Sequence, residues 1–171
     1  HSDLRRQRQM CIRDSYDISC KFLFVAMNDE LKSGFKFLSQ YVKELSFENP
    51  NVPRKLPHMM AKPDINVSVN VNAATLDKEN SIYEVEISTK ATSTIDDEPC
   101  FIIDLSYACV VQLNNIEQNN KSFVILVEIP RMLFPFVRRI IADSVRDGGF
   151  PPLYIEPIDF LKLFEKNMKK N

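Results

Sequence analysis

Few side chains in this sequence are arranged for catalysis or for metal binding. His58 is the one histidine after residue 26, so residues 27–171 cannot supply a site with two histidine ligands. Cys100 and Cys109 lack Cys-x-x-Cys spacing, and Cys109 falls on an apolar strand face, where packing is expected rather than nucleophilic attack. None of the three glycines is followed by lysine, so no phosphate-binding loop is present. The sequence therefore predicts no enzyme, no cofactor and no metal.

Aromatic and proline residues are instead concentrated in the C-terminal third. They occur as Phe134-Pro135-Phe136, as Phe150-Pro151-Pro152, and as Phe160 with Phe164. One interpretation is an aromatic-lined groove for flexible apolar ligands. The other is that these side chains complete the hydrophobic core, and composition alone leaves both open.

The composition is that of a soluble globular protein with one domain. The chain has 171 residues, of which 44% are hydrophobic and 26% charged, and its formal net charge is −1. Without a basic excess, nucleic acid is not an expected partner. Uncharged stretches such as 105–116 are much shorter than the about 20 residues of a spanning helix, so membrane insertion is not expected either. The sparse cysteines of residues 27–171 favour a reducing, cytoplasmic compartment.

Residues 1–26 differ from the rest of the chain. They hold five of the 22 basic residues, the other histidine, and both Cys11 and Cys20. The run at 5–14 resembles translated adaptor sequence, and Met27 is the first residue that suits a native start. We therefore expect 1–26 to be a non-native extension of a domain at 27–171, the alternative being a flexible N-terminal arm.

Four strands are predicted, followed by helices. Residues 37–47 are a strand candidate, 65–72 and 82–95 alternate apolar with polar residues, and 100–113 are apolar on both faces. A strand of the last kind is covered on both sides, either within a two-sided core or by helices on one face and a second subunit on part of the other.

Two helices are expected after the strands. The first has an apolar stripe from Leu133 to Val145, a start restricted by Pro135, and a stop at Gly148-Gly149. The second is expected to open at Pro157 and to end in lysines. Strands followed by helices predict an α+β domain with an antiparallel sheet.

The sequence contains five distinctive runs, Leu45-Ser-Phe-Glu-Asn-Pro-Asn-Val-Pro53, Tyr83-Glu-Val85, Leu133-Phe-Pro-Phe-Val-Arg138, Gly149-Phe-Pro-Pro-Leu153 and Pro157-Ile-Asp-Phe160. In these residues, and in their order across about 27–164, the chain resembles the SecB family of protein-export chaperones. The resemblance implies a four-stranded antiparallel sheet with C-terminal helices packed on one face, and assembly as a homotetramer, a dimer of dimers. It also implies a cytoplasmic chaperone that binds unfolded preproteins, keeps them translocation-competent and delivers them to the SecA motor.

The resemblance also assigns residues. The client groove is expected to be lined by Phe101, Phe134, Pro135, Phe136, Phe160 and Phe164. The SecA-contacting surface is expected at Glu44 and Glu48, after the first strand, together with Ile102 and Asp104. Tetramer assembly is expected to depend on Ile103, Leu105 and Tyr107, so Leu105→Asp is expected to give a smaller assembly that binds clients weakly.

Two other functions remain open at this stage. A small-molecule or lipid carrier would use the same aromatic groove and predicts a closed cavity in a monomer. An enzyme would act through surface carboxylates such as Asp104 and Glu84.

Overall fold

The computed structural model describes residues 34–53 and 63–168, which fall within one compact unit of the chain. The expectation about residues 1–26, like His58, lies outside these described residues. Within the described part, no helix is long and apolar enough to span a membrane.

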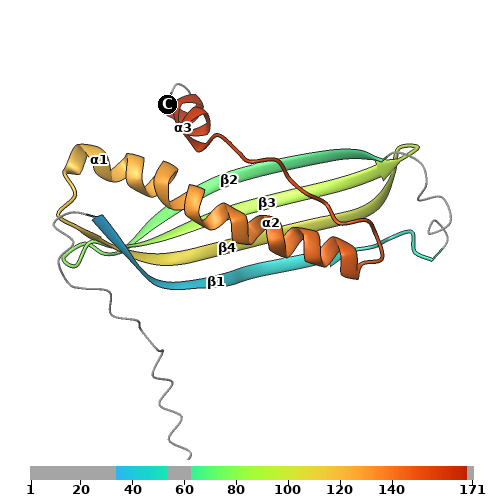
Figure 1. The fold of residues 1–171 in the computed structure, drawn as a ribbon, viewed down its shortest axis with the longest axis horizontal. Coiled ribbons are helices and arrows are strands. Elements are labelled where there is room, and N and C mark those ends of the chain that lie inside the picture. The colour runs from blue at the N-terminus through green and yellow to red at the C-terminus, as the bar shows by residue number, and fades with distance from the viewer. Residues whose placement is uncertain (1–33, 54–62, 169–171) are drawn as a thin grey trace, which may run out of the picture. The chain divides into compact units, whose positions relative to one another are not determined.

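Four long strands form one antiparallel sheet (Figure 1). They are β1 Gly34–Glu48, β2 Asp64–Asp77, β3 Ile82–Ile95 and β4 Glu98–Asn114, in the spatial order β1-β4-β3-β2. Alternation predicted β2 and β3, a run that is apolar on both faces predicted β4, and β1 was a strand candidate; the predicted fold class is confirmed. β4, the most apolar strand, is internal and pairs with β1 on one side and β3 on the other.

Acidic residues form the two hairpin turns. Asp77 accepts hydrogen bonds from the backbone N–H groups of Glu79 and Asn80, at 2.9 and 3.1 Å, and so closes the turn between β2 and β3. Asp96 and Asp97, both with positive φ (53° and 61°), form the two-residue turn between β3 and β4. Aspartate tolerates this left-handed backbone, and two such residues give a turn whose twist matches that of the strands.

A long helical segment covers one face of the sheet (Figure 1). It consists of α1 Gln118–Phe123, a π-helical turn η2 at Val124–Glu128, and α2 Ile129–Asp147. The prediction that Pro135 marks the start of the helix is wrong, because Pro135 lies inside α2. The buried stripe of Leu133, Val137, Ile141 and Val145 holds the helix on the sheet despite the backbone hydrogen bond that a proline cannot donate.

The last helix, α3, spans Phe160–Met168. It begins three residues later than predicted, because Asp159 rather than Pro157 caps it. The Asp159 carboxylate accepts hydrogen bonds from the N–H groups of Leu161 and Lys162, at 3.1 and 3.2 Å. These bonds satisfy two of the free donors at a helix N-terminus.

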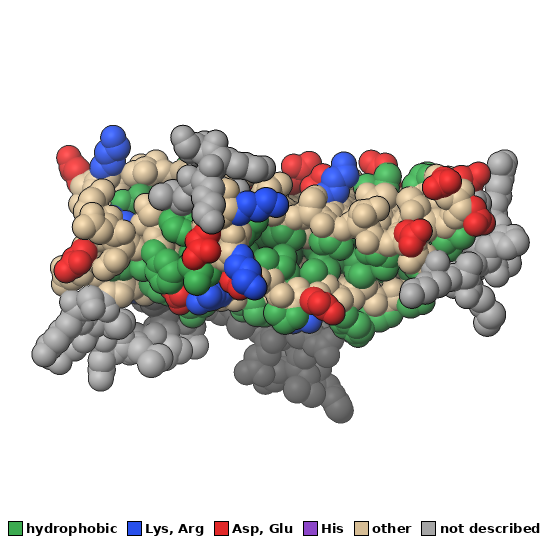
Figure 2. All heavy atoms as spheres, turned by 90° about the horizontal axis from the view of Figure 1, so that it is seen from above, with side chains coloured by type: hydrophobic (Ala, Val, Ile, Leu, Met, Phe, Trp, Pro, Cys, Tyr) green, Lys and Arg blue, Asp and Glu red, His purple; other side chains and the backbone are tan. Residues whose placement is uncertain are grey.

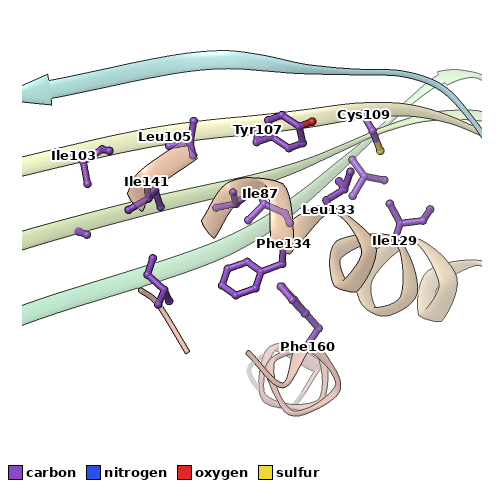
Figure 3. Packing of buried hydrophobic residues seen from close by; sticks show 14 of the residues in the cluster. Ile87, Ile103, Leu105, Tyr107, Cys109, Ile129, Leu133, Phe134, Ile141 and Phe160 are labelled. Atoms are coloured by element: carbon purple, nitrogen blue, oxygen red, sulfur yellow. The ribbon is translucent and has the colours of Figure 1, made fainter. Parts of the chain in front are cut away.

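The hydrophobic core lies between the sheet and α2 (Figure 3). Every odd-numbered residue of β4 from Phe101 to Leu113 is buried, and most of them pack with Val85 and Ile87 of β3 against the apolar stripe of α2. Even-numbered residues of β4, such as Ile102 and Asp104, point to the opposite face, which no described helix covers. The sheet therefore has a helix-covered face and an open face.

Candidate functional site

An apolar pocket opens at the end of the sheet where β2 and β4 begin and β3 ends. Its volume is about 180 Å³. The loop that follows α2 forms its outer wall, and the three strand ends form its floor. Its lining consists of Pro63, Ile65, Ser93, Ile95, Cys100, Phe101, Phe150, Pro151, Pro152 and Leu153.

Three aromatic rings in succession brace this pocket. Phe47 of β1 stacks on Phe101 of β4, with ring centroids 5.9 Å apart and planes inclined by 20°. Phe101 in turn meets Phe150 edge to face, at 5.1 Å. Such aromatic pairs stabilise a fixed ring arrangement by about 0.5–1.5 kcal/mol beyond the burial of their area. The position of Phe150 in the pocket wall is therefore fixed by aromatic rings of β1 and β4.

The C-terminus of α2 determines where Phe150 lies. The Phe150 N–H donates to the carbonyl of Val145 at 3.2 Å, and Gly149 has a φ of 89°, which turns the chain back toward the sheet. Gly148 lies against the ring of Phe47, where a Cβ atom would collide with it. Asn49 donates a 3.1 Å hydrogen bond to the Gly148 carbonyl and so ties this turn to the end of β1.

The chemistry of the pocket favours uncharged apolar groups. None of its lining residues carries a charge, and Ser93 and Cys100 are the only ones with a side-chain hydroxyl or thiol. Ser93 is almost fully buried. A pocket of this kind binds through apolar contact area and places few geometric demands on the group that enters it.

The predicted groove residues do not meet in one place. Phe101 is the only one of the six that lines the pocket. Phe134 and Phe160 pack against each other in the core, edge to face with centroids 5.5 Å apart (Figure 3). Pro135 and Phe136 are exposed on α2, and the Phe136 ring stacks on Tyr107 at 6.1 Å. Phe164 is half-buried on α3.

Sequence reasoning did not assign the loop residues of the pocket to the groove. The run Phe150-Pro151-Pro152 stood out as an excess of aromatic and proline residues, yet it was left out of the groove set. The available signal was its position directly after two glycines, which turn the chain at the end of a helix.

The four residues expected to contact SecA lie together on the open face. Glu44 and Glu48 are within β1 rather than after it, and Glu48 is directly opposite Ile102 of β4. Asp104 pairs with Ser46, which lies between the two glutamates along β1. Both glutamates are exposed, while Ile102 and Asp104 are half-buried.

A hydrogen-bonded cluster occupies the middle of the same open face. The Tyr41 hydroxyl donates to Glu84 at 2.5 Å, and the Lys43 ammonium bridges Glu84 and Glu86 at 3.1 and 2.9 Å. The hydrogen bond from Tyr41, followed by that from Lys43, lowers the pKa of Glu84. A general acid needs a raised pKa, so Glu84 has the opposite shift and the carboxylate-enzyme alternative gains no support from it.

The three residues expected to affect tetramer assembly belong to the core of the single chain. Ile103 and Leu105 are fully buried and Tyr107 is 8% exposed, all on the helix-covered face of β4 (Figure 3). Side chains in this position contact the α2 side of the same chain. In the described part of the chain, these side chains therefore support the packing of α2 on the sheet.

The two described cysteines, Cys100 and Cys109, are both buried, but only Cys100 borders the pocket. Cys109 is fully buried, and burial raises the pKa of its thiol to about 12. Cys100 is 4% exposed and lines the pocket. Among residues 34–53 and 63–168, no three His, Cys, Asp or Glu side chains gather in a way that suits a metal ion.

The family model and the similar proteins all point to one family. The family model described as preprotein translocase subunit SecB matches residues 28–171. A protein-export protein SecB of Azorhizobium caulinodans is 41% identical over 140 residues, which cover 82% of this chain and 86% of that protein. Its counterpart in Methylocella silvestris is 48% identical over 131 residues, covering 77% and 80%.

A solved structure has the same fold. It is a SecB-like chaperone of Mycobacterium tuberculosis in complex with a peptide from an antitoxin, with a TM-score of 0.60. The two sequences are only 12% identical, and the match covers 72% of this chain and 90% of that one. The match to the family model and the identity to these relatives show that this chain belongs to the SecB family of protein-export chaperones.

Proposed function

We propose that the pocket beside Phe101 and Phe150 is where this chaperone binds unfolded preproteins, which it keeps translocation-competent and delivers to the SecA motor without any bond chemistry. The observation that carries the proposal is an uncharged pocket of about 180 Å³ lined by aromatic rings and prolines. An apolar cavity of about 150 Å³ binds benzene. The pocket therefore has room for one aromatic or branched aliphatic side chain of a client.

The energetics of such a site suit a chaperone. Burying one large apolar side chain contributes about 1.5–3 kcal/mol, and the ordering of a flexible client offsets part of that gain. Each pocket thus binds weakly and releases its client readily. A homotetramer presents several pockets to one chain, and the resulting effective concentration raises the overall affinity.

Client and SecA are expected to use opposite faces of the sheet. Phe101 faces the pocket, while the next residue, Ile102, points to the open face beside Glu48. Glu44, Glu48 and Asp104 would form an acidic surface for a basic region of SecA, with Ile102 as an apolar contact. This arrangement allows both partners to be bound at once.

Assembly would depend on α2. Met132 of α2 is 52% exposed, and Phe136, whose ring stacks on Tyr107, is 42% exposed, so α2 offers apolar surface to a second subunit. Ile103, Leu105 and Tyr107 pack beneath α2, so changes at these residues would affect a tetramer through α2 and not by direct contact. The cytoplasm is the compartment in which such a chaperone would meet preproteins before export.

The client site is tested with two phenylalanine variants of the full chain. Phe150→Ala removes a pocket wall, whereas Phe123→Ala removes an equally large, 37% exposed ring of α1 that does not line the pocket. We expect Phe150→Ala to weaken the binding of a labelled, reduced and carboxymethylated unfolded protein about fivefold or more, as measured by fluorescence anisotropy. Phe123→Ala is the matched control and should bind as the wild type does. Equal affinity of all three proteins would exclude the pocket as the client site.

The SecA surface has a separate test. Glu48→Lys reverses one exposed charge on the open face and should weaken binding to SecA about tenfold, with a strong dependence on salt. Client affinity of the same variant should be unchanged, because Glu48 points away from the pocket. Unchanged SecA affinity would place the contact elsewhere.

A further inference from the structure

Two side chains that can form hydrogen bonds lie in the wall of the otherwise apolar pocket. They are Ser93, near the end of β3, and Cys100, near the start of β4. Ser93 is 1% exposed and Cys100 is 4% exposed. Buried polar groups are normally hydrogen-bonded, because an unpaired one costs free energy. A buried hydroxyl and a buried thiol that both face an apolar pocket therefore suggest a polar group in whatever enters it.

A β-bulge turns Cys100 into the pocket. Along β3, Thr94 is opposite Pro99 of β4. Its neighbour Ser93 is opposite Phe101, so Cys100 is left without a partner in β3. Consecutive residues of a regular strand point to opposite faces, yet Cys100 and Phe101 both line the pocket. Bulges redirect side chains in this way and are frequent beside functional sites.

The Ser93 hydroxyl is available for a hydrogen bond with a bound group. Among the described residues it has no hydrogen-bond partner, and Ser93 lines the pocket. By register, Ser93 lies between Ile65 of β2 and Phe101 of β4, which also line the pocket. A buried hydroxyl in this position is satisfied either by a water molecule or by a polar atom of the group that occupies the pocket.

The size of the pocket suits an aromatic ring with one polar substituent. Its volume is about 180 Å³. An apolar cavity of about 150 Å³ holds benzene, and one water molecule takes about 30 Å³ of the liquid, so the pocket has room for a ring and a hydroxyl group. Tyrosine is the side chain that combines an aromatic ring with a hydroxyl that both donates and accepts.

Apolar contact alone would not distinguish one client side chain from another. Seen from the β2 side, hydrophobic side chains form a band along the long axis of the unit, so apolar surface is widely available there (Figure 2). A buried hydroxyl adds discrimination, because a group that displaces its water without replacing the hydrogen bond loses affinity. A phenylalanine ring would displace the water in this way, whereas a tyrosine would replace the hydrogen bond.

From these observations we propose that the pocket selects tyrosine over purely apolar side chains of an unfolded client, with the tyrosine hydroxyl hydrogen-bonded to Ser93. The Cys100 thiol, a weak donor and a weak acceptor, is a second polar contact. This inference rests on the proposed function and adds to it the class of side chain that the pocket prefers. Apolar side chains still bind, because the rest of the lining is apolar, and the preference is added to that binding.

Three peptides test the preference with the full chain. They are short, uncharged and identical except for a central tyrosine, phenylalanine or 4-methylphenylalanine. The last of these keeps nearly the size of tyrosine but has a methyl group in place of the hydroxyl. NMR titration of the peptide signals measures even weak affinities. We expect the wild type to bind the tyrosine peptide about fivefold or more tightly than the other two.

Serine variants assign the preference to one hydroxyl. Ser93→Ala should abolish it, because the hydroxyl is removed and the apolar lining remains. Cys100→Ala should reduce it by about twofold, since a thiol forms weaker hydrogen bonds. Ser68→Ala, at an exposed serine on the open face of β2, is the matched control and should retain the full preference.

The outcomes separate this inference from the proposed function. Equal binding of the three peptides by the wild type would overturn the selection of tyrosine, and so would a preference that persists in Ser93→Ala. In either case, weaker binding of all three peptides by Phe150→Ala would leave the pocket as the client site. Equal affinities of the wild type and Phe150→Ala for every peptide would overturn both.

Discussion

The rings of Phe101 and Phe150 meet edge to face, with centroids 5.1 Å apart and planes inclined by 63°. Phe101 belongs to the internal strand β4, whereas Phe150 follows the last turn of α2. Their contact joins the loop after α2 to the floor of the sheet and forms one side of the pocket. The pocket therefore depends on tertiary packing that brings two distant parts of the sequence together.

A bound client should shield the thiol of Cys100. Cys100 lines the pocket, whereas Cys109 is fully buried and burial raises the pKa of its thiol to about 12. In a full chain with Cys11 and Cys20 replaced by serine, we expect maleimide to react with Cys100 first and with Cys109 only on unfolding. Saturating unfolded client should slow the reaction of Cys100 severalfold. Mass spectrometry of the labelled peptides measures both rates, and a Cys100 rate that is indifferent to client would argue against pocket occupancy.

Replacement of Pro135 by alanine should stabilise the protein. Pro135 lies inside α2 and is exposed, and it cannot donate the helical hydrogen bond to the carbonyl of Arg131. Since an internal proline costs a helix about 3 kcal/mol, we expect Pro135→Ala to raise the free energy of unfolding by about 1–3 kcal/mol. Urea denaturation followed by circular dichroism measures this change.

The same variant shows whether the client surface extends along α2. Pro135 was expected in the groove but lies outside the pocket, so client affinity should remain within about twofold of the wild type. Pro157→Ala, an exposed proline before α3, is the control and should change stability little. A clear loss of client affinity in Pro135→Ala alone would place Pro135 on the client surface.

The strands could be read from the sequence because their determinants are local. Alternation of apolar and polar residues defines both faces of β2 and β3, and the acidic turn residues mark where the hairpins reverse. The predicted start of the helix was wrong because that prediction also used local sequence alone. A local rule about proline was applied at Pro135, but the buried stripe on α2 outweighs the cost of one missing hydrogen bond.

The pocket could not be read from the sequence in the same way. Whether a phenylalanine lines a pocket or fills the core depends on which elements cross above it, and no periodicity distinguishes Phe101 from Phe134. Similarly, Leu105 is fully buried, so Leu105→Asp would place an unpaired charge in the core of the subunit. That variant is expected to unfold the chain rather than to separate folded subunits, and it is not a suitable test of assembly.

Thr89 offers a stabilising substitution in the core. Its side chain is fully buried on the helix-covered face of β3, and its hydroxyl oxygen has no hydrogen-bond partner within the described structure. By register it lies between Val69 and Leu105. Thr89→Val keeps the shape and removes the unpaired hydroxyl, so we expect the free energy of unfolding to rise by about 1 kcal/mol. Thr92→Val, on the open face of the same strand, should have little effect on urea denaturation. A destabilised Thr89→Val would mean that the hydroxyl has a partner in solution, such as a buried water.

The hydrogen bond between Tyr41 and Glu84 should make stability depend on pH. It lowers the pKa of Glu84 and raises that of Tyr41. A carboxyl whose pKa is lower in the folded state stabilises the fold above its unfolded pKa of about 4.3, and this contribution is lost as the pH falls through the folded value.

We expect Tyr41→Phe to lower the free energy of unfolding by about 1 kcal/mol at pH 7. The difference from the wild type should shrink when the urea midpoints are compared below about pH 4. Tyr154→Phe, at a side chain that is 71% exposed, is the control and should match the wild type at both pH values. If Tyr41→Phe were equally destabilising across the whole range, its effect would come from packing rather than from the hydrogen bond to an ionised Glu84.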